Sequence, residues 1–214
     1  LYTNVQKYNL TYSTLKCPDS NHPHLIDLGL PSGTKWACCN IGANEPTQEG
    51  GFYSWGELEP KYSYSCDTYK YCHPYYYENV HVVKGYEYED IGTDISGSQY
   101  DVAHIKWGGN WKMPTKKQIQ ELVDSCSFKW SNKGKGGVYL TGPNGGSIYF
   151  PAGNFRTNST HARGGCWIWS STLVPEIEEQ SLSYILLYGP AGSFYNKWDT
   201  ADRSQGLNVR AVIE

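Results

Sequence analysis

The chain has 214 residues, of which 18% are charged and 15% are aromatic, and its formal net charge is −3. This length suits one domain with a sizeable core, and the balanced charge gives no reason to expect a nucleic acid or an anionic membrane as partner. No stretch approaches the roughly 20 apolar residues that a membrane-spanning helix needs, and no signal peptide is visible among the first residues.

Residues 1–23 form a polar segment that we interpret as an N-terminal extension, and we expect the main domain over residues 24–214. Short strands are predicted at 25–30 and 35–41, on either side of a turn at Pro31, Ser32 and Gly33, and another strand at 52–55. Residues 58–100 contain many tyrosines and few aliphatic side chains. A long insertion loop is therefore expected there, of the kind that is usually functional or mobile.

The clearest helix is predicted at 115–126. Thr115 is a good N-cap, and Gln118 three residues later completes a capping box. An apolar stripe with helical spacing follows, made of Ile119, Leu122, Val123 and Cys126. This stripe predicts one helix face packed on the core.

A β-hairpin is predicted from strands at 138–140 and 147–150, because the glycine-rich segment 142–146 between them is typical of a turn. The last strands are predicted at 167–171, 183–188 and 208–213, with loops at 173–182 and 189–205. Together these elements predict a single α+β domain with a twisted antiparallel sheet, one main helix and long loops.

Seven cysteines leave at least one without a disulfide partner in the same chain. Cys66 and Cys72 lie close together in a polar segment and are candidates for a local disulfide, which would suit an oxidising compartment. Cys39 and Cys126 lie among apolar residues and are expected to be buried thiols. Because no Cys-x-x-Cys pair occurs, a structural zinc site is disfavoured.

Five short motifs follow one another along the chain: LIDLGLPSGTKWACCNI at 25–41, FYSWGE at 52–57, WGGNWKMPT at 107–115, WIWSS at 167–171 and GLNVRAV at 206–212. In this order they resemble a bacterial family of paralogous surface domains from Bacteroidetes and Fibrobacter, which includes the variable proteins of diversity-generating retroelements. The resemblance covers roughly residues 24–214. It implies a C-type-lectin-like fold, ligand binding through the C-terminal half and no catalysis.

Enzyme chemistry finds little support in the sequence. The segment 111–115 is similar to the one that opens the helix in formylglycine-generating enzymes, which hold copper with two nearby C-terminal cysteines, but Cys166 has no cysteine after it. The chain also lacks a Gly-x-Ser-x-Gly elbow and a His-Glu-x-x-His helix. We therefore predict a protein that is not an enzyme and that uses no cofactor.

Calcium-dependent sugar binding is weakly indicated. Lectins of this fold place a Glu-Pro-Asn or Gln-Pro-Asp tripeptide before a Trp-Asn-Asp, and here 175–176 and 198–199 match only in part. Carboxylates that would suit calcium are present at Glu176, Glu178, Glu179 and Asp199. A solvated acidic loop is the preferred interpretation, and no metal is expected.

A binding surface is expected between about residues 164 and 205, because aromatic side chains there mix with small polar ones as in antibody paratopes. The candidate ligand-binding residues are Trp167, Leu173, Val174, Tyr184, Tyr188, Ser193, Tyr195, Asn196, Trp198, Asp199, Asp202 and Arg203. Trp167 and Trp169 alternate along one predicted strand, so one is expected to face the core and the other the ligand.

The resemblance also implies which positions vary. In retroelement-diversified proteins the randomised template codons are typically of the AAC type, which cannot become Trp, Lys, Glu, Gln or Met. Fixed positions would then include Glu176, Trp167, Trp169, Lys197 and Trp198, while Leu173, Val174, Tyr184, Tyr188, Ser193, Tyr195, Asn196, Asp199 and Asp202 are eligible to vary. Residues 170–171 and 206–212 match the fixed frame, in which Arg210 is expected to be structural and paired.

The sequence thus predicts a non-catalytic binding protein, displayed outside the cell on a bacterial or phage surface, that binds a protein or a glycan. A retroelement-diversified variable protein is the first interpretation. A fixed adhesin or pilus-associated subunit is the alternative, and an oxidase of the formylglycine-generating type is disfavoured.

Overall fold

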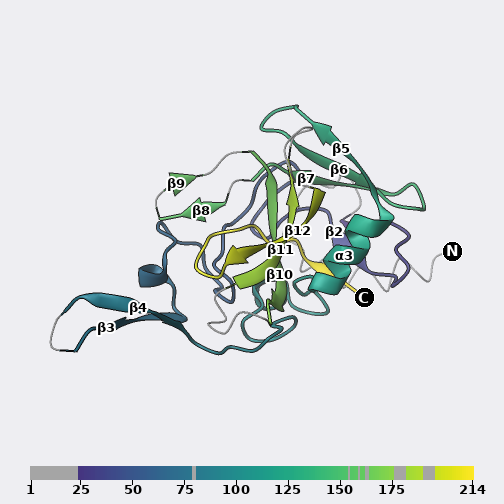
Figure 1. Ribbon diagram of the computed structural model, residues 1–214. Helices are drawn as coiled ribbons and strands as arrows, with labels where there is room; N and C mark the ends of the chain where they lie inside the picture. The colour runs from purple at the N-terminus through teal and green to yellow at the C-terminus, as the bar shows by residue number, and fades with distance from the viewer. Residues whose placement is uncertain are drawn as a thin grey trace.

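The computed structural model describes residues 24–78, 81–153, 155–158, 160–161, 164–175, 182–189 and 196–214, with the backbone alone at 160, 161, 187, 188 and 196–198. Over this part of the chain the protein has an α+β fold of mostly antiparallel strands with few helices (Figure 1). No described helix is long and apolar enough to cross a membrane. The predicted N-terminal extension, residues 1–23, lies outside the described residues.

A small sheet joins the two ends of the described chain. It consists of β1 (Leu25–Asp27), β2 (Lys35–Ala37) and β13 (Val212–Ile213), with β2 between the other two. The predicted turn between β1 and β2 is confirmed, since the Gly33 N–H donates to the Leu30 carbonyl at 2.9 Å. The predicted strands at 25–30, 35–41 and 208–213 are longer than the observed ones. The predicted strand at 52–55 is reduced to an isolated bridge between Tyr53 and Leu207.

Arg210 ties this small sheet to its neighbours and is fully buried. Its Nε donates to the Asn40 side chain at 2.8 Å, and one terminal nitrogen donates to the carbonyls of Ala37 and Cys38, each at 3.0 Å. The other terminal nitrogen donates to the Tyr149 carbonyl at 3.1 Å. The predicted structural role of this arginine is confirmed, because its planar fork satisfies carbonyl groups of separate segments.

The predicted helix is confirmed as α3 (Lys116–Ser125). The Thr115 side chain accepts from the Gln118 N–H at 3.3 Å, and the Gln118 side chain accepts from the Thr115 N–H at 2.9 Å, which completes the capping box. A short helix that was not predicted, α2 (Val102–Trp107), precedes it. The buried Asp101 caps α2 by accepting from two backbone N–H groups.

The predicted hairpin is confirmed as β6 (Gly137–Thr141) and β7 (Ser147–Pro151), and an unpredicted strand, β5 (Ser127–Ser131), adds to β6. The inner face of this sheet packs with the apolar stripe of α3. One core cluster results, which includes Trp36, Ile119, Leu122, Leu140 and Phe150.

A second sheet runs through the middle of the molecule, with the order β10 (Cys166–Leu173), β11 (Leu182–Tyr188) and β12 (Asn196–Asp202). The prediction of a loop across 189–205 is wrong at β12, which pairs with β11 along its whole length. Trp55, Trp169 and Ile185 belong to the core cluster at this sheet. A short pair, β8 (Arg156–Thr157) and β9 (Thr160–His161), lies apart from it.

The segment 58–100 is not the structureless loop that was predicted. It contains a 3-10 turn, η1 (Cys66–Thr68), and an antiparallel hairpin of β3 (Cys72–Tyr76) and β4 (Val83–Tyr88). The aromatic and β-branched side chains of these strands favour extended backbone, which explains the hairpin. Figure 1 shows the hairpin projecting from the body of the molecule, and we call its described residues, 72–78 and 81–88, the arm.

Candidate functional site

Four of the predicted ligand-binding side chains lie inside the protein. Leu173 is 2% exposed, Val174 8%, Tyr184 7% and Arg203 0%. The ring of Tyr184 is also covered by α3, since the Lys116 ammonium lies 4.0 Å from the ring centroid. The expected exposure of Val174 and Arg203 is wrong, and Leu173 and Tyr184 likewise present little surface to a ligand.

The two tryptophans that alternate along β10 differ in burial, and the expectation that one of them faces the core is confirmed. Trp169 is fully buried, and its indole N–H donates to the Tyr53 carbonyl at 2.7 Å. Trp167 is half-buried, and its ring centroid lies 4.6 Å from that of Phe155. Ligand contact by Trp167 stays a prediction.

The remaining residues of the predicted surface are only partly described. Asp199 is exposed, and its carboxylate accepts from the Thr200 N–H at 2.8 Å. The backbones of three others lie in β11 and β12, while their side chains fall outside the description: Tyr188, Asn196 and Trp198. Outside the described residues altogether lie Ser193, Tyr195 and the calcium candidates Glu176, Glu178 and Glu179.

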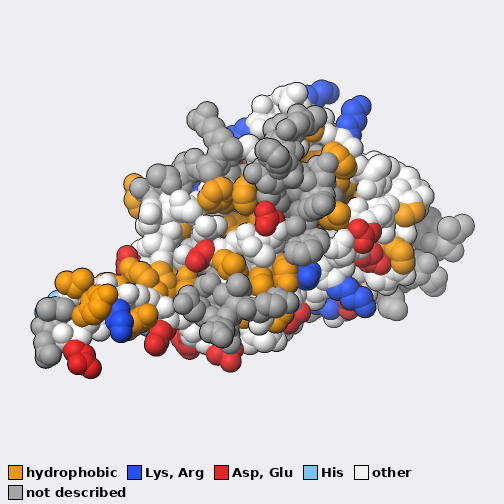
Figure 2. Space-filling model, viewed as in Figure 1, with side chains coloured by type: hydrophobic (Ala, Val, Ile, Leu, Met, Phe, Trp, Pro, Cys, Tyr) orange, Lys and Arg blue, Asp and Glu red, His pale blue; other side chains and the backbone are white. Residues whose placement is uncertain are grey.

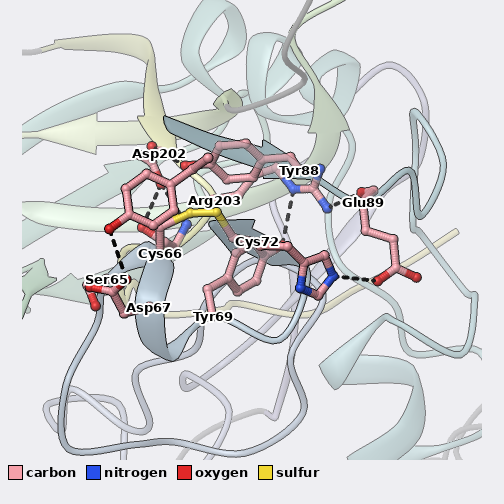
Figure 3. The surroundings of a disulfide bond; sticks show 12 residues. Ser65, Cys66, Asp67, Tyr69, Cys72, Tyr88, Glu89, Asp202 and Arg203 are labelled. Carbon is pink, nitrogen blue, oxygen red and sulfur yellow. Dashed lines mark hydrogen bonds and ion pairs between the residues drawn. A yellow bond between two sulfur atoms is a disulfide. The ribbon is translucent and has the colours of Figure 1, made fainter. Parts of the chain in front are cut away.

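Asp202 and Arg203, at the end of β12, contact the arm (Figure 3). Asp202 accepts from the Tyr88 hydroxyl at 2.8 Å. The buried Arg203 donates from Nε to the Tyr69 hydroxyl and from a terminal nitrogen to the Glu89 carbonyl, both at 3.1 Å. Its guanidinium also lies 5.5 Å from the centre of the Tyr88 ring. Both residues were predicted to bind ligand, but these contacts show that they brace the base of the arm.

Tyr69 belongs to the same hydrogen-bonded network as Arg203 at the base of the arm, and we call this network the brace. Burial raises the pKa of the Tyr69 phenol well above its usual value, so the hydroxyl keeps its proton. That proton is donated to the Trp55 carbonyl at 2.6 Å, while the same oxygen accepts from Arg203. The brace is therefore fully hydrogen-bonded at this point, as a rigid buried network requires.

A disulfide closes the base of the arm. Cys66 in η1 is bonded to Cys72 at the start of β3, with their Cα atoms 5.3 Å apart (Figure 3). The predicted local pairing of these two cysteines is confirmed. Across the same end, the Tyr86 hydroxyl donates to the Asp67 carboxylate at 2.8 Å. An isolated two-stranded hairpin is only marginally stable in water, so the disulfide and these hydrogen bonds supply the order that the hairpin lacks alone.

The distal half of the arm exposes apolar side chains. Figure 2 shows them as an orange group along the projecting hairpin. The exposed fractions run from 40% to 59% for Tyr75, Tyr76, Tyr77, Val82 and Val83. The pairing of Tyr76 with Val83 and the bond from the Tyr77 N–H to the Val82 carbonyl, at 3.1 Å, hold these residues together at the end of the hairpin. We call this set the arm tip.

The tip rings are positioned by their neighbours. Tyr75 lies across Gly85, where a methyl group on that residue would collide with the phenol. The Lys84 ammonium lies 5.7 Å from the centre of the Tyr77 ring. The density of tyrosines in this segment predicted a functional or mobile loop, but none of the predicted site residues lies there. The signal that would have located it is the extended pattern of aromatic and valine side chains on both sides of residues 78–81.

The described cysteines outside the disulfide suit structural roles. Cys166 is fully buried, its thiol donates to the Phe150 carbonyl at 3.1 Å, and burial raises the pKa of that thiol to about 12. A thiol held protonated at neutral pH is a poor metal ligand and a poor nucleophile. Cys39 is buried as predicted, whereas Cys126 is only partly buried. Within the described part of the chain, no group of three His, Cys, Asp or Glu side chains is arranged to hold a metal.

No protein-family model, curated protein or solved structure matches this chain.

Proposed function

We propose that this protein is a non-catalytic recognition protein that binds a protein partner through the arm tip. The observation that carries the proposal is the set of half-exposed tyrosines and valines at the end of a hairpin that a disulfide and a buried arginine hold in place. Tyrosine combines a large apolar ring with a polar hydroxyl and loses little conformational entropy on binding, so it suits recognition surfaces.

The brace at the base supports this proposal energetically. Ordering a flexible loop on binding costs free energy, whereas a hairpin that is already ordered avoids that cost. The arm projects from the body (Figure 1), and Figure 2 shows apolar side chains along it, where a partner can reach them. Contiguous apolar surface on a projecting element is typical of protein interaction sites.

A C-type-lectin-like fold and display on a bacterial or phage surface are proposed with the same function. The order of the five motifs supports the fold assignment, as does the burial of the segment 206–212 that the resemblance gives as fixed frame. A disulfide in the arm is consistent with an oxidising compartment and therefore with export.

A fixed adhesin is favoured over a retroelement-diversified protein by one observation. Leu173, Val174 and Tyr184 were eligible to vary, yet all three are buried. Random replacement there by Asp, Asn or Ser would bury polar groups without partners, at about 1–3 kcal/mol each. A protein that must remain folded in every copy would not place its variation at such positions.

The test is an array of purified extracellular proteins, with a glycan array beside it, probed with the wild-type protein and with Tyr76→Ala/Tyr77→Ala. We expect protein ligands for the wild type and a loss of at least about tenfold in affinity for the double variant. Tyr62→Ala, at an exposed tyrosine outside the arm, serves as the matched control and should bind like the wild type. Equal binding by the double variant would exclude the arm tip, and glycan ligands alone would exclude a protein partner.

A further inference from the structure

The outer face of the β5–β6–β7 sheet carries a row of three side chains that the proposed function does not use. The register pairs Lys129 with Tyr139 and Tyr139 with Tyr149, so all three project from the same face. The two tyrosine rings lie 4.7 Å apart between centroids, and Tyr139 is 44% exposed. We call these three residues the tyrosine platform.

The tyrosine platform is ordered before any ligand arrives. The Tyr149 hydroxyl donates to the Gly136 carbonyl at 2.9 Å. Its ring lies over Gly137, where a methyl group would collide with the phenol and with the Phe150 carbonyl. Glycine at 137 is thus what allows the ring to lie against the sheet and support Tyr139.

A cavity of about 530 Å³ opens beside the platform. Its walls are Tyr139 and Tyr149, the turn after β5 with Ser131, Lys133 and Lys135, and the segment 47–49 on the opposite side. This volume lies within the range of roughly 300–1,000 Å³ that small-ligand sites occupy. The walls combine an aromatic surface with hydroxyl, amide and ammonium groups.

The charge here is opposite to that of the whole protein, which is −3. Lys129 belongs to the platform, and Lys133 and Lys135 line the cavity, whereas Glu49 is the one carboxylate among the lining residues. The Glu49 carboxylate forms an ion pair with the Lys135 ammonium at 2.9 Å. Neither Lys129 nor Lys133 has an acidic partner among the residues that the structure describes. Figure 2 shows blue side chains gathered over β5 and β6 at the top of the view.

We infer that the tyrosine platform and its cavity bind an acidic saccharide, one whose sugar rings carry carboxylate groups. The C–H face of a sugar ring packs on the exposed ring of Tyr139, as apolar groups do on aromatic rings. Its carboxylate pairs with Lys133 and Lys129, which have no acidic partner within the described part of the chain. Its hydroxyls exchange hydrogen bonds with Thr47, Gln48 and Ser131, which are donors and acceptors of the right kind.

A nucleic acid fits this surface less well. Single-stranded nucleic acids follow a long basic groove that contacts several successive phosphates. Here the basic groups are confined to one cavity mouth on a protein whose net charge is negative. The small hydroxyl and amide side chains of the cavity instead match a ligand that is rich in hydroxyl groups.

The experiment is calorimetric titration with tetragalacturonate and with the same tetramer fully methyl-esterified, which removes the charge and keeps the rings. We expect the acid to bind, the ester to bind at least about tenfold more weakly, and salt to weaken the acid alone. Tyr139→Ala should weaken the acid at least about tenfold, and Lys133→Gln should remove most of the preference for acid over ester. Equal affinity for acid and ester, or unchanged binding by Tyr139→Ala, would overturn the inference.

Controls separate this site from the arm tip and from unspecific charge. Lys117→Gln, at an exposed lysine on α3, and Tyr76→Ala, on the arm, should both bind tetragalacturonate like the wild type. A glucuronate-containing tetrasaccharide tests a second acidic sugar, and failure of both acids to bind would overturn the saccharide assignment. Tighter binding of an eight-nucleotide single-stranded DNA would likewise overturn it. Loss of array ligands in the arm variants leaves these titrations unaffected, so the two proposals fail separately.

Discussion

Two buried arginines show what single residues contribute in this protein. Arg210 was expected to be structural and is, whereas Arg203 was expected at a ligand surface and is fully buried. From the sequence alone, a charged residue in a polar stretch is expected to lie at the surface, and this expectation is correct for most arginines. Arg203 departs from it because its main partner, Tyr69, lies 134 positions away in the chain, and no local pattern reports such a contact.

Arg203→Lys should destabilise the protein by about 3 kcal/mol, because lysine cannot reproduce the two directed hydrogen bonds to Tyr69 and Glu89 or stack on Trp55. Chemical denaturation followed by tryptophan fluorescence measures the change. Asp199→Ala, at an exposed residue of β12, should shift the free energy of unfolding by less than about 0.5 kcal/mol. Similar stability for both variants would show that Arg203 does not brace the arm.

At the scale of elements, the parts that could be predicted are those encoded locally. The capping box and the apolar stripe define α3 within a dozen residues, and the glycine-rich turn defines β6 and β7. The arm and β12 were missed because their stability depends on distant partners. The arm needs the Cys66–Cys72 disulfide and contacts with Asp202 and Arg203, and β12 needs the whole length of β11.

Replacing both cysteines of the arm, as Cys66→Ser/Cys72→Ser, should lower the free energy of unfolding by about 2 kcal/mol, since the bond closes only a short loop. The larger effect should be local. Amide hydrogen exchange at Gly85 and Glu87, which pair with Tyr75 and His73 across the hairpin, should accelerate more than exchange in α3, because the hairpin loses its covalent closure.

Cys126→Ser is the control for this pair of substitutions, since Cys126 lies at the end of α3 and away from the arm. Its arm amides should exchange at the wild-type rate. Unaltered exchange in the arm of the double variant would mean that the hydrogen bonds to Asp67 and Asp202 order the hairpin without the disulfide.

At the scale of the whole molecule, the arm and the β5–β6–β7 sheet, which carries the tyrosine platform, lie on opposite sides of the body (Figure 1). The β10–β11–β12 sheet, which was predicted to contribute to the ligand-binding surface, is the central sheet and lies between them. It buries Leu173, Val174 and Tyr184. The motifs on which the proposed resemblance rests include the segment 206–212, which is buried. The exposed aromatic groups of the arm tip and of the tyrosine platform lie outside those motifs, so the motifs could not locate them.

This arrangement makes a prediction about the gene in many isolates. If the central sheet is scaffold, as the burial of Leu173, Val174 and Tyr184 indicates, substitutions in codons 164–205 should be few and no denser than elsewhere. Nucleotide sequencing of the locus measures this directly. Dense substitutions in those codons, traceable to adenines of a template repeat, would instead establish a diversified binder. Codons 173, 174 and 184 should remain apolar or aromatic even then, because a polar group buried there without a partner would cost about 1–3 kcal/mol.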